Sequence, residues 1–154
     1  MSEENVEIVR RIYAALDLSV PGSVSRYGGG PPESIKGLID PEIEWQGPRE
    51  FPDLAETVYG YEGMAGYAAK VAEALDDYRM EPERFIDAGG DRVLVFSREG
   101  GRGKGSGAEV QTHLTAHLWT LRDGKAVRMQ SYWEWADALE AVGLSEQDAR
   151  AEAS

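Results

Sequence analysis

Residues 117–133 read HLWTLRDGKAVRMQSYW, and this segment is the strongest indication of the fold. At its centre is Asp123-Gly124, a dipeptide typical of the two-residue turn of a β-hairpin. Apolar and polar residues alternate on either side of this turn, as in a strand that buries one face. We therefore predict a long strand over 109–122, a tight turn, and a returning strand over 125–135.

The residues before this hairpin add two strands, over 79–87 and 92–99, joined by a turn at Gly89-Gly90-Asp91. Two helices are predicted earlier, over 5–18 and 61–77, because apolar residues recur there at helical spacing. Further expected elements are a short helical turn over 34–39, a strand over 42–46 and a closing helix over 136–142. Helices followed by a run of strands indicate an α+β fold with an antiparallel sheet.

A chain of 154 residues suits one domain, which we place at residues 1–144. A chain of this size buries about 70 % of its unfolded surface, so it can form a substantial core. Two segments lie outside the regular pattern. Residues 19–32 are rich in glycine and proline and are interpreted as a loop or lid, and residues 145–154 as an acidic tail.

The charge balance restricts the partners. Lys and Arg total 16 against 28 Asp and Glu, which gives a net charge of −12. Such a chain repels phosphate backbones, so nucleic-acid binding is not expected. It also lacks a basic cluster that would bind an anionic membrane surface.

Several kinds of site and location are disfavoured by composition. The chain has no cysteine, which excludes disulfides, thiolate metal sites, iron–sulfur clusters and cysteine nucleophiles. The acidic N-terminus has no apolar run typical of a secretory signal, and no stretch approaches the ~18 apolar residues of a membrane span. A soluble, cytoplasmic protein is the expectation.

The glycine-rich stretch GGRGKGSGA, over 100–108, invites a phosphate-binding interpretation. A phosphate loop needs a helix directly after it, whose free N–H groups hold the anion. Here a strand follows, and Gly103-Lys104 has no Ser or Thr after the lysine. A hairpin turn is the better interpretation, and no cofactor is predicted.

His113 and His117 are the two histidines of the chain. Four residues of a strand span about 13 Å, so the pair is not expected to share a metal ion. Strand alternation places both on a face with Thr115 and Trp119, opposite the apolar Leu114, Ala116 and Leu118. Either they are core histidines with satisfied hydrogen bonds, or they line a pocket.

The last strand is rich in aromatic residues, with Tyr132, Trp133 and Trp135 within four positions. Met129, Ser131 and Trp133 share one face of this strand. Core packing or a dimer face is the ordinary interpretation. The alternative is a pocket for a planar, hydrophobic ligand.

Polar groups for catalysis are harder to assign. Ser131 and His117 can meet across the final hairpin, but the sequence provides no third group to activate the serine. Arg98 and Glu99 lie near a strand end, and strand parity does not tell which of them faces inward.

The order and spacing of several strings resemble the SnoaL-like proteins of the nuclear transport factor 2-like superfamily, which includes the ketosteroid isomerases. The strings are ENVEIVRRIYAAL, LIDPEIEW, VYGYEGMAGY, HLWTLRDGKAVRMQSYW and ALEAVGL. The resemblance covers most of residues 4–144. It implies a cone in which a strongly curved sheet wraps around N-terminal helices and encloses an apolar cavity, and it implies a homodimer.

The resemblance also implies site positions. The base carboxylate of ketosteroid isomerases aligns with Trp45, which cannot take a proton. Their protonated oxyanion donor aligns with His117, and their tyrosine donor falls at Ile12, beside Tyr13. Where SnoaL-type cyclases carry a catalytic aspartate, this chain has Ser131.

We therefore expect a cavity of a few hundred Å³ that touches both His117 and Trp45. The expected ligand is a small hydrophobic cyclic compound, either bound only or also converted by isomerase- or cyclase-type acid–base chemistry. His117 would be the acid, base or donor, supported by His113 and Ser131. The expected pocket residues are Tyr13, Trp45, Met64, Tyr67, Thr115, Met129 and Trp133. The alternatives are a non-catalytic binding or dimerisation module, and a hydrolase or dehydratase of the same superfamily.

Overall fold

The computed structural model describes residues 2–18, 30–103 and 109–145. The chain begins with helix α1 (Ser2–Leu16) and the short 3₁₀ helix η2 (Glu33–Leu38), followed by strand β1 (Ile39–Gln46). Next come α2 (Pro52–Ala55), β2 (Val58–Tyr59) and α3 (Gly60–Ala74). Strands β3 (Leu75–Gly89), β4 (Arg92–Gly103), β5 (Glu109–Arg122) and β6 (Lys125–Tyr132) precede the closing helix α4 (Trp135–Val142).

The six strands form one curled sheet in the order β2-β1-β6-β5-β4-β3. Each neighbouring pair is antiparallel except β1 and β6, which run parallel. The predicted α+β fold is therefore confirmed, with one parallel pair in the sheet that the sequence pattern does not indicate. Asp123 and Gly124 both adopt positive φ angles, 52° and 77°, as the predicted β5–β6 turn requires.

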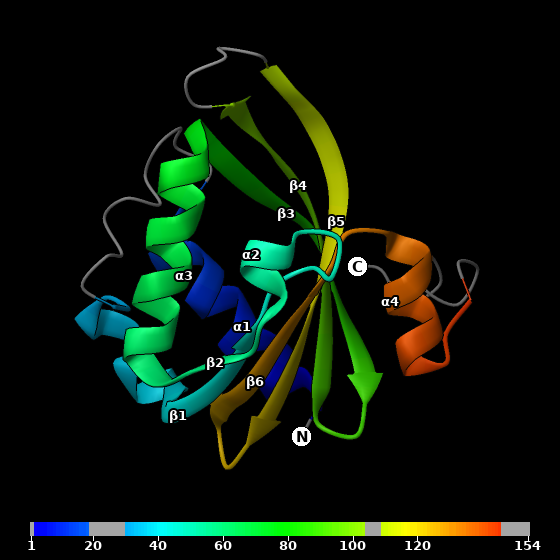
Figure 1. Ribbon diagram of the computed structural model, residues 1–154. Coiled ribbons are helices and arrows are strands. Elements are labelled where there is room, and N and C mark those ends of the chain that lie inside the picture. Colours follow the sequence, from blue (N-terminus) through cyan, green and yellow to red (C-terminus); the bar gives the residue numbers. More distant parts are fainter. Residues whose placement is uncertain (1, 19–29, 104–108, 146–154) are drawn as a thin grey trace.

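The sheet has two covered faces. Helices α1 and α3 lie on its inner side, and α4 lies on its outer side (Figure 1). Val93, Val95 and Trp119 pack with the apolar stripe of α1 in the inner core. Leu94 and Phe96 belong to a second cluster, which includes Leu139 of α4.

The apolar stripe predicted for the first helix is buried in the structure of α1. Val9, Ile12, Tyr13 and Leu16 recur at helical spacing, and all four are buried against the sheet. Burial of one such aliphatic side chain stabilises the fold by about 1.5–3 kcal/mol. This packing places the Tyr13 hydroxyl inside the cone.

Several element boundaries differ from the prediction. Helix α3 ends at Ala74 because the chain turns into strand β3 at Leu75. Between β1 and α3 the structure has two short elements, α2 and β2, which the sequence pattern does not predict. Gly47 permits a close approach there, since a Cβ on it would lie 2.4 Å from the Leu54 carbonyl oxygen.

Some predicted segments cannot be compared. Residues 19–29 of the expected loop, 104–108 of the glycine-rich turn and 146–154 of the tail lie outside the described residues. In the part that is described, no helix is long and apolar enough to span a membrane.

Candidate functional site

A small cavity lies inside the cone, bordered by α1, α3 and the inner face of the sheet. Its volume is about 90 Å³. It touches both His117 and Trp45, as expected, but it is smaller than the few hundred Å³ expected. Large side chains take up much of the interior, including Tyr13, Trp45, Tyr67 and Trp119.

Seven of the residues expected at the site line this cavity: Tyr13, Trp45, Met64, Tyr67, His117, Met129 and Ser131. Further lining residues include Leu16, Ala68, Val71, Tyr78, Met80, Glu99 and Trp119. Among the described lining residues, Glu99 carries the one carboxylate, and none is a lysine or arginine. The cavity is therefore apolar with one acidic group.

Strand register positions the polar side chains. His117 of β5 lies opposite Val95 of β4 and Ser131 of β6. Trp119 lies opposite Met129, which is in turn paired with Trp45 of β1. These residues share the inner face because alternate residues of a strand point to the same side.

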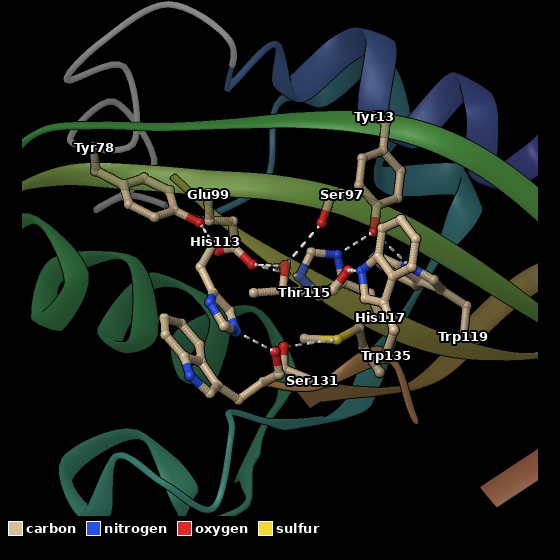
Figure 2. A network of polar contacts seen from close by, with 12 residues as sticks. Tyr13, Tyr78, Ser97, Glu99, His113, Thr115, His117, Trp119, Ser131 and Trp135 are labelled. Atoms are coloured by element: carbon tan, nitrogen blue, oxygen red, sulfur yellow. Dashed lines mark hydrogen bonds and ion pairs between the residues drawn. The ribbon is translucent and has the colours of Figure 1, made fainter. Parts of the chain in front are cut away.

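His117 is held at both ring nitrogens. Its Nδ1 lies 2.7 Å from the Tyr13 hydroxyl, and its Nε2 lies 3.3 Å from Oε2 of Glu99. Trp119 donates from Nε1 to the Tyr13 oxygen over 2.9 Å. Figure 2 shows this series of contacts, which runs from Trp119 through Tyr13 and His117 to Glu99.

The direction of these hydrogen bonds follows from Tyr13. Burial, partly opposed by the Trp119 hydrogen bond and reinforced by the charge of Glu99, raises the pKa of Tyr13 well above its usual value. Its hydroxyl therefore keeps its proton and needs an acceptor, which is Nδ1 of His117. His117 then carries its own proton on Nε2 and donates it to Glu99.

Glu99 accepts from three sides. Besides His117, the hydroxyls of Thr115 and Tyr78 donate to its two oxygens. Ser97 lies 3.0 Å from Thr115 and donates to it in turn, since the Thr115 proton is already engaged. Burial opposes ionisation, but the hydrogen bond and charge of His117, with the bonds from Thr115 and Tyr78, outweigh it and lower the pKa of Glu99.

Two more tyrosines border the carboxylate. Burial and the charge of Glu99 raise the pKa of Tyr67 and of Tyr78 well above the usual value. Ser131 moderates the shift of Tyr67 through a side-chain hydrogen bond. Both hydroxyls therefore remain protonated, and that of Tyr78 donates to Glu99.

Aromatic rings form most of the remaining wall. Trp45 meets Tyr67 and Trp119 edge to face, with ring centroids 5.9 and 5.6 Å apart. Trp119 meets Tyr13 in the same way at 5.7 Å. Nε1 of Trp45 is buried and has no hydrogen-bond partner among the described residues.

Three expected residues lie outside the cavity lining. His113 stacks on Trp133 at 3.9 Å and contacts its backbone oxygen over 2.9 Å, and Phe51 packs on the same indole. Thr115 is buried behind Glu99. His113 and His117 therefore have separate partners, and no three His, Asp or Glu side chains of the described part of the chain form a cluster that could hold a metal ion.

The sequence left open whether Glu99 or Arg98 faces inward, and it gave no indication of Tyr78 as a site residue. Glu99 faces inward, whereas Arg98 pairs with Glu83 away from the cavity. The sequence did contain one indication: Glu99 lies an even number of residues from Val93, Val95 and Ser97, so it shares their face of the strand. Parity did not decide because Leu94 and Phe96, on the opposite face, are also apolar and buried.

The family follows from the match of residues 9–129 to the SnoaL-like domain. The chain therefore belongs to the SnoaL-like family, and its cone fold with an interior cavity agrees with this assignment. The resemblance noted in the sequence is therefore confirmed.

Solved structures give the same fold. TerC, crystallised with polyporic acid, is 29 % identical over 91 % of this chain and 98 % of its own, with a TM-score of 0.67. A nuclear transport factor 2-like protein of Burkholderia thailandensis is 25 % identical over 89 % and 95 %, with a TM-score of 0.68. A SnoaL-like polyketide cyclase assigned in Jannaschia is 20 % identical over 94 % of both chains, with a TM-score of 0.62. The comparison with curated proteins finds no relative.

Proposed function

We propose that this protein binds a small hydrophobic cyclic compound in its interior cavity and converts it by acid–base chemistry at His117 and Glu99. The observation that carries the proposal is the pairing of His117 Nε2 with Glu99 Oε2, at 3.3 Å, inside an otherwise apolar and aromatic cavity. Pockets of this character, with few polar groups, are typical of small-molecule sites.

The two side chains suit opposite roles. A carboxylate with a lowered pKa is ionised at neutral pH, so Glu99 is available as a proton acceptor. His117 carries a proton on Nε2 and is suited to donate a hydrogen bond to a ligand oxygen. Removal of a proton beside a carbonyl whose oxygen receives a hydrogen bond is the central step of isomerase- and cyclase-type reactions.

The Nε2 side of His117 is the side that a ligand would take. Its separation from Glu99 is 3.3 Å, longer than the usual 2.7–3.2 Å of an N–H···O bond, whereas Nδ1 and Tyr13 are 2.7 Å apart. A ligand oxygen would replace Glu99 at Nε2 and leave the Tyr13 contact intact. Tyr13 is then a positioning residue that keeps the proton of His117 on the cavity side.

The comparison with TerC supports a cyclic ligand, because that protein, 29 % identical, was crystallised with polyporic acid. Trp45 supports it as well, since its ring borders the cavity beside Tyr67 and Trp119. Thr115 has a supporting part in this proposal because it orients Glu99. His113 and Trp133 stack on each other outside the cavity lining and take no part in it.

The test is binding and turnover in matched variants. Cyclohexanone and phenol are titrated by calorimetry, and hits guide a screen of cyclic ketones for isomerisation or condensation. His117→Ala is expected to abolish turnover, while His113→Ala, a change on the same strand outside the cavity, leaves it intact. Equal turnover in both variants contradicts the role of His117, and failure of every cyclic probe to bind the wild type contradicts the cavity as a ligand site.

A non-catalytic binding module is the second candidate. It is favoured by the engagement of both His117 nitrogens within the protein and by the small cavity volume. In that case cyclic probes bind but no proton exchange occurs. Deuterium incorporation from heavy water into a bound ketone distinguishes the two roles.

A homodimer, which the family resemblance implies, and a cytoplasmic location, which the composition predicts, remain part of the proposal. Sedimentation equilibrium of the full chain tests the first, and fractionation of producing cells tests the second.

A further inference from the structure

Tyr67 lies on the face of helix α3 that borders the cavity. It follows Met64 by three residues and precedes Val71 by four, and all three residues line the cavity. Its ring meets that of Trp45 edge to face, and a Cβ at Gly47 would lie 2.8 Å from its Cε2 atom. Cε2 is next to the carbon that bears the hydroxyl, so the lack of a side chain at Gly47 leaves room for this end of the ring.

The other two tyrosines of the described cavity lining already donate to protein groups. The hydroxyl of Tyr13 donates to Nδ1 of His117, and that of Tyr78 donates to Glu99. Tyr67 is not among the donors to Glu99, although it lies close enough for the charge of the carboxylate to raise its pKa. Its hydroxyl therefore differs from the other two in having no strong acceptor among the described residues.

The hydrogen bond between Tyr67 and Ser131 has a definite direction. Burial and the charge of Glu99 raise the pKa of Tyr67, and the Ser131 bond lowers it. A bond donated to a tyrosine oxygen favours the phenolate and lowers the pKa, whereas a bond donated by the tyrosine would raise it. Ser131 is therefore the donor, and Sδ of Met129, 3.6 Å from the Ser131 oxygen, is a weaker competitor for the same proton. This bond leaves the proton of Tyr67 free for another acceptor.

Tyr67 and His117 lie beside the same residue, Ser131. Ser131 of β6 is paired with His117 of β5 in the sheet register, and side chains paired in this way have Cβ atoms about 4.5–5.5 Å apart. Ser131 also forms the hydrogen bond to Tyr67, and all three residues line the cavity. A ligand oxygen bound at Nε2 of His117 would therefore lie in the neighbourhood of the Tyr67 hydroxyl.

We propose that Tyr67 determines the specificity of this cavity by donating a hydrogen bond to a carbonyl oxygen of the ligand. A carbonyl oxygen has two lone pairs and no proton, which suits the two donors Tyr67 and His117. A site with donors placed in this way rejects an analogue that lacks the acceptor, because the buried donors then stay unpaired. This inference rests on the proposed use of the cavity as a ligand site and names the group that the ligand must carry.

The experiment compares two probes of similar shape that differ in the acceptor, cyclohexanone and methylenecyclohexane. The ratio of their affinities for the full chain, measured by calorimetry, is the quantity of interest, because the ketone loses more hydration on binding. Tyr67→Phe removes the hydroxyl and keeps the ring. It is expected to lower the affinity for cyclohexanone relative to methylenecyclohexane by about two- to tenfold, which corresponds to one hydrogen bond. Tyr59→Phe, at a tyrosine that is 62 % exposed, is the control and should leave the ratio unchanged.

The infrared carbonyl stretch of bound cyclohexanone separates donation from packing. A hydrogen bond donated to a carbonyl lowers this frequency, so the frequency should rise in Tyr67→Phe and stay unchanged in Tyr59→Phe. A tyrosine that only packs against the ligand would not move it. Circular dichroism verifies that each variant is folded. Should Tyr67→Phe fail to fold, NMR of the wild type gives the answer: the Cζ resonance of Tyr67 should shift with cyclohexanone more than with methylenecyclohexane.

The outcomes separate this inference from the proposed function. An unchanged affinity ratio and carbonyl frequency in folded Tyr67→Phe overturn the role of Tyr67 and leave the hydrophobic site standing. A carbonyl frequency that rises in His117→Ala but not in Tyr67→Phe has the same meaning, because His117 is then the donor by itself. Equal shifts of the Tyr67 resonance with both probes also overturn the inference. Binding of neither probe to the wild type overturns both proposals.

Discussion

The side chains of His117 and Tyr13 are in contact although the two residues lie 104 positions apart in the sequence. Nδ1 of His117 is 2.7 Å from the Tyr13 hydroxyl. The contact joins helix α1 to strand β5 across the interior of the cone. It also fixes which nitrogen of His117 carries the proton, because the buried Tyr13 hydroxyl keeps its own. The first helix therefore sets the chemistry of a residue on the fifth strand.

Removal of the Tyr13 hydroxyl tests this link. Tyr13→Phe keeps the ring but leaves Nε1 of Trp119 and Nδ1 of His117 without their partner. We expect the free energy of unfolding to fall by about 1–3 kcal/mol, the cost of unsatisfied buried polar groups. Urea denaturation measures it. Tyr59→Phe, at a tyrosine that is 62 % exposed, is the control and should change stability little. Equal stability of both variants would show that the buried bonds contribute nothing net.

Acid stability should depend on Glu99. The pKa of this carboxyl is lower in the folded protein than its ordinary value, so its ionised form stabilises the fold above that ordinary value. The stabilisation is lost as the pH falls through the lowered pKa. We expect the unfolding free energy of the wild type to decrease from about pH 5 downward, and the decrease to be smaller in Glu99→Gln.

Glu83→Gln serves as the reference in that experiment, since Glu83 pairs with Arg98 away from the cavity. Denaturant melts of the three proteins at several pH values provide the comparison. Parallel pH profiles for the wild type and Glu99→Gln would contradict the prediction.

The hydroxyl of Thr115 should keep the carboxylate of Glu99 acidic. Thr115→Val removes one of its three donors at nearly constant shape. The pKa of Glu99 should therefore rise toward its ordinary value, since a hydrogen bond to the charged form is lost. Titration of the carboxyl carbon by NMR measures the change, and Thr120→Val on the same strand is the control. An unchanged pKa of Glu99 in Thr115→Val would contradict the proposed effect of the Thr115 hydroxyl.

Two glycine substitutions should have opposite effects. A Cβ at Gly47 would lie 2.4 Å from the Leu54 carbonyl oxygen and 2.8 Å from the Tyr67 ring. Gly47→Ala should therefore lower the melting temperature and disturb the cavity wall. At Gly66, inside α3, a Cβ meets nothing within 4 Å, so Gly66→Ala should stabilise the protein by about 0.5–1 kcal/mol through helix propensity. Calorimetric melting of both variants decides; a loss of stability in both, or in neither, contradicts the packing described.

Much of the fold could be predicted from local chemistry. Asp123-Gly124 defines its hairpin because both residues tolerate positive φ, and the stripe of α1 is visible because one face of the helix stays exposed. The parallel partnership of β1 and β6 could not be predicted, since it joins distant segments and depends on the closure of the sheet. The short elements α2 and β2 have too few residues to show a period.

The site residues could be predicted only on strands where apolar and polar side chains visibly alternate. Strand β5 has a polar-spotted face beside an apolar one, so His117 could be assigned to the interior. Strand β4 is buried on both faces over Val93–Phe96, so the orientation of Glu99 could not be decided. The role of Tyr78 depends on Glu99 and was hidden for the same reason.

The parallel pairing of β1 with β6 has a kinetic consequence. It brings together two segments from opposite ends of the chain, so its loop-closure entropy cost is large and it gains little from local contacts. The meander of β3 to β6 consists of neighbours in sequence and is expected to form earlier on the folding route. Trp45, which belongs to β1, would then take its place in the cavity wall late in folding. The ligand site would be completed only after the rest of the domain has folded.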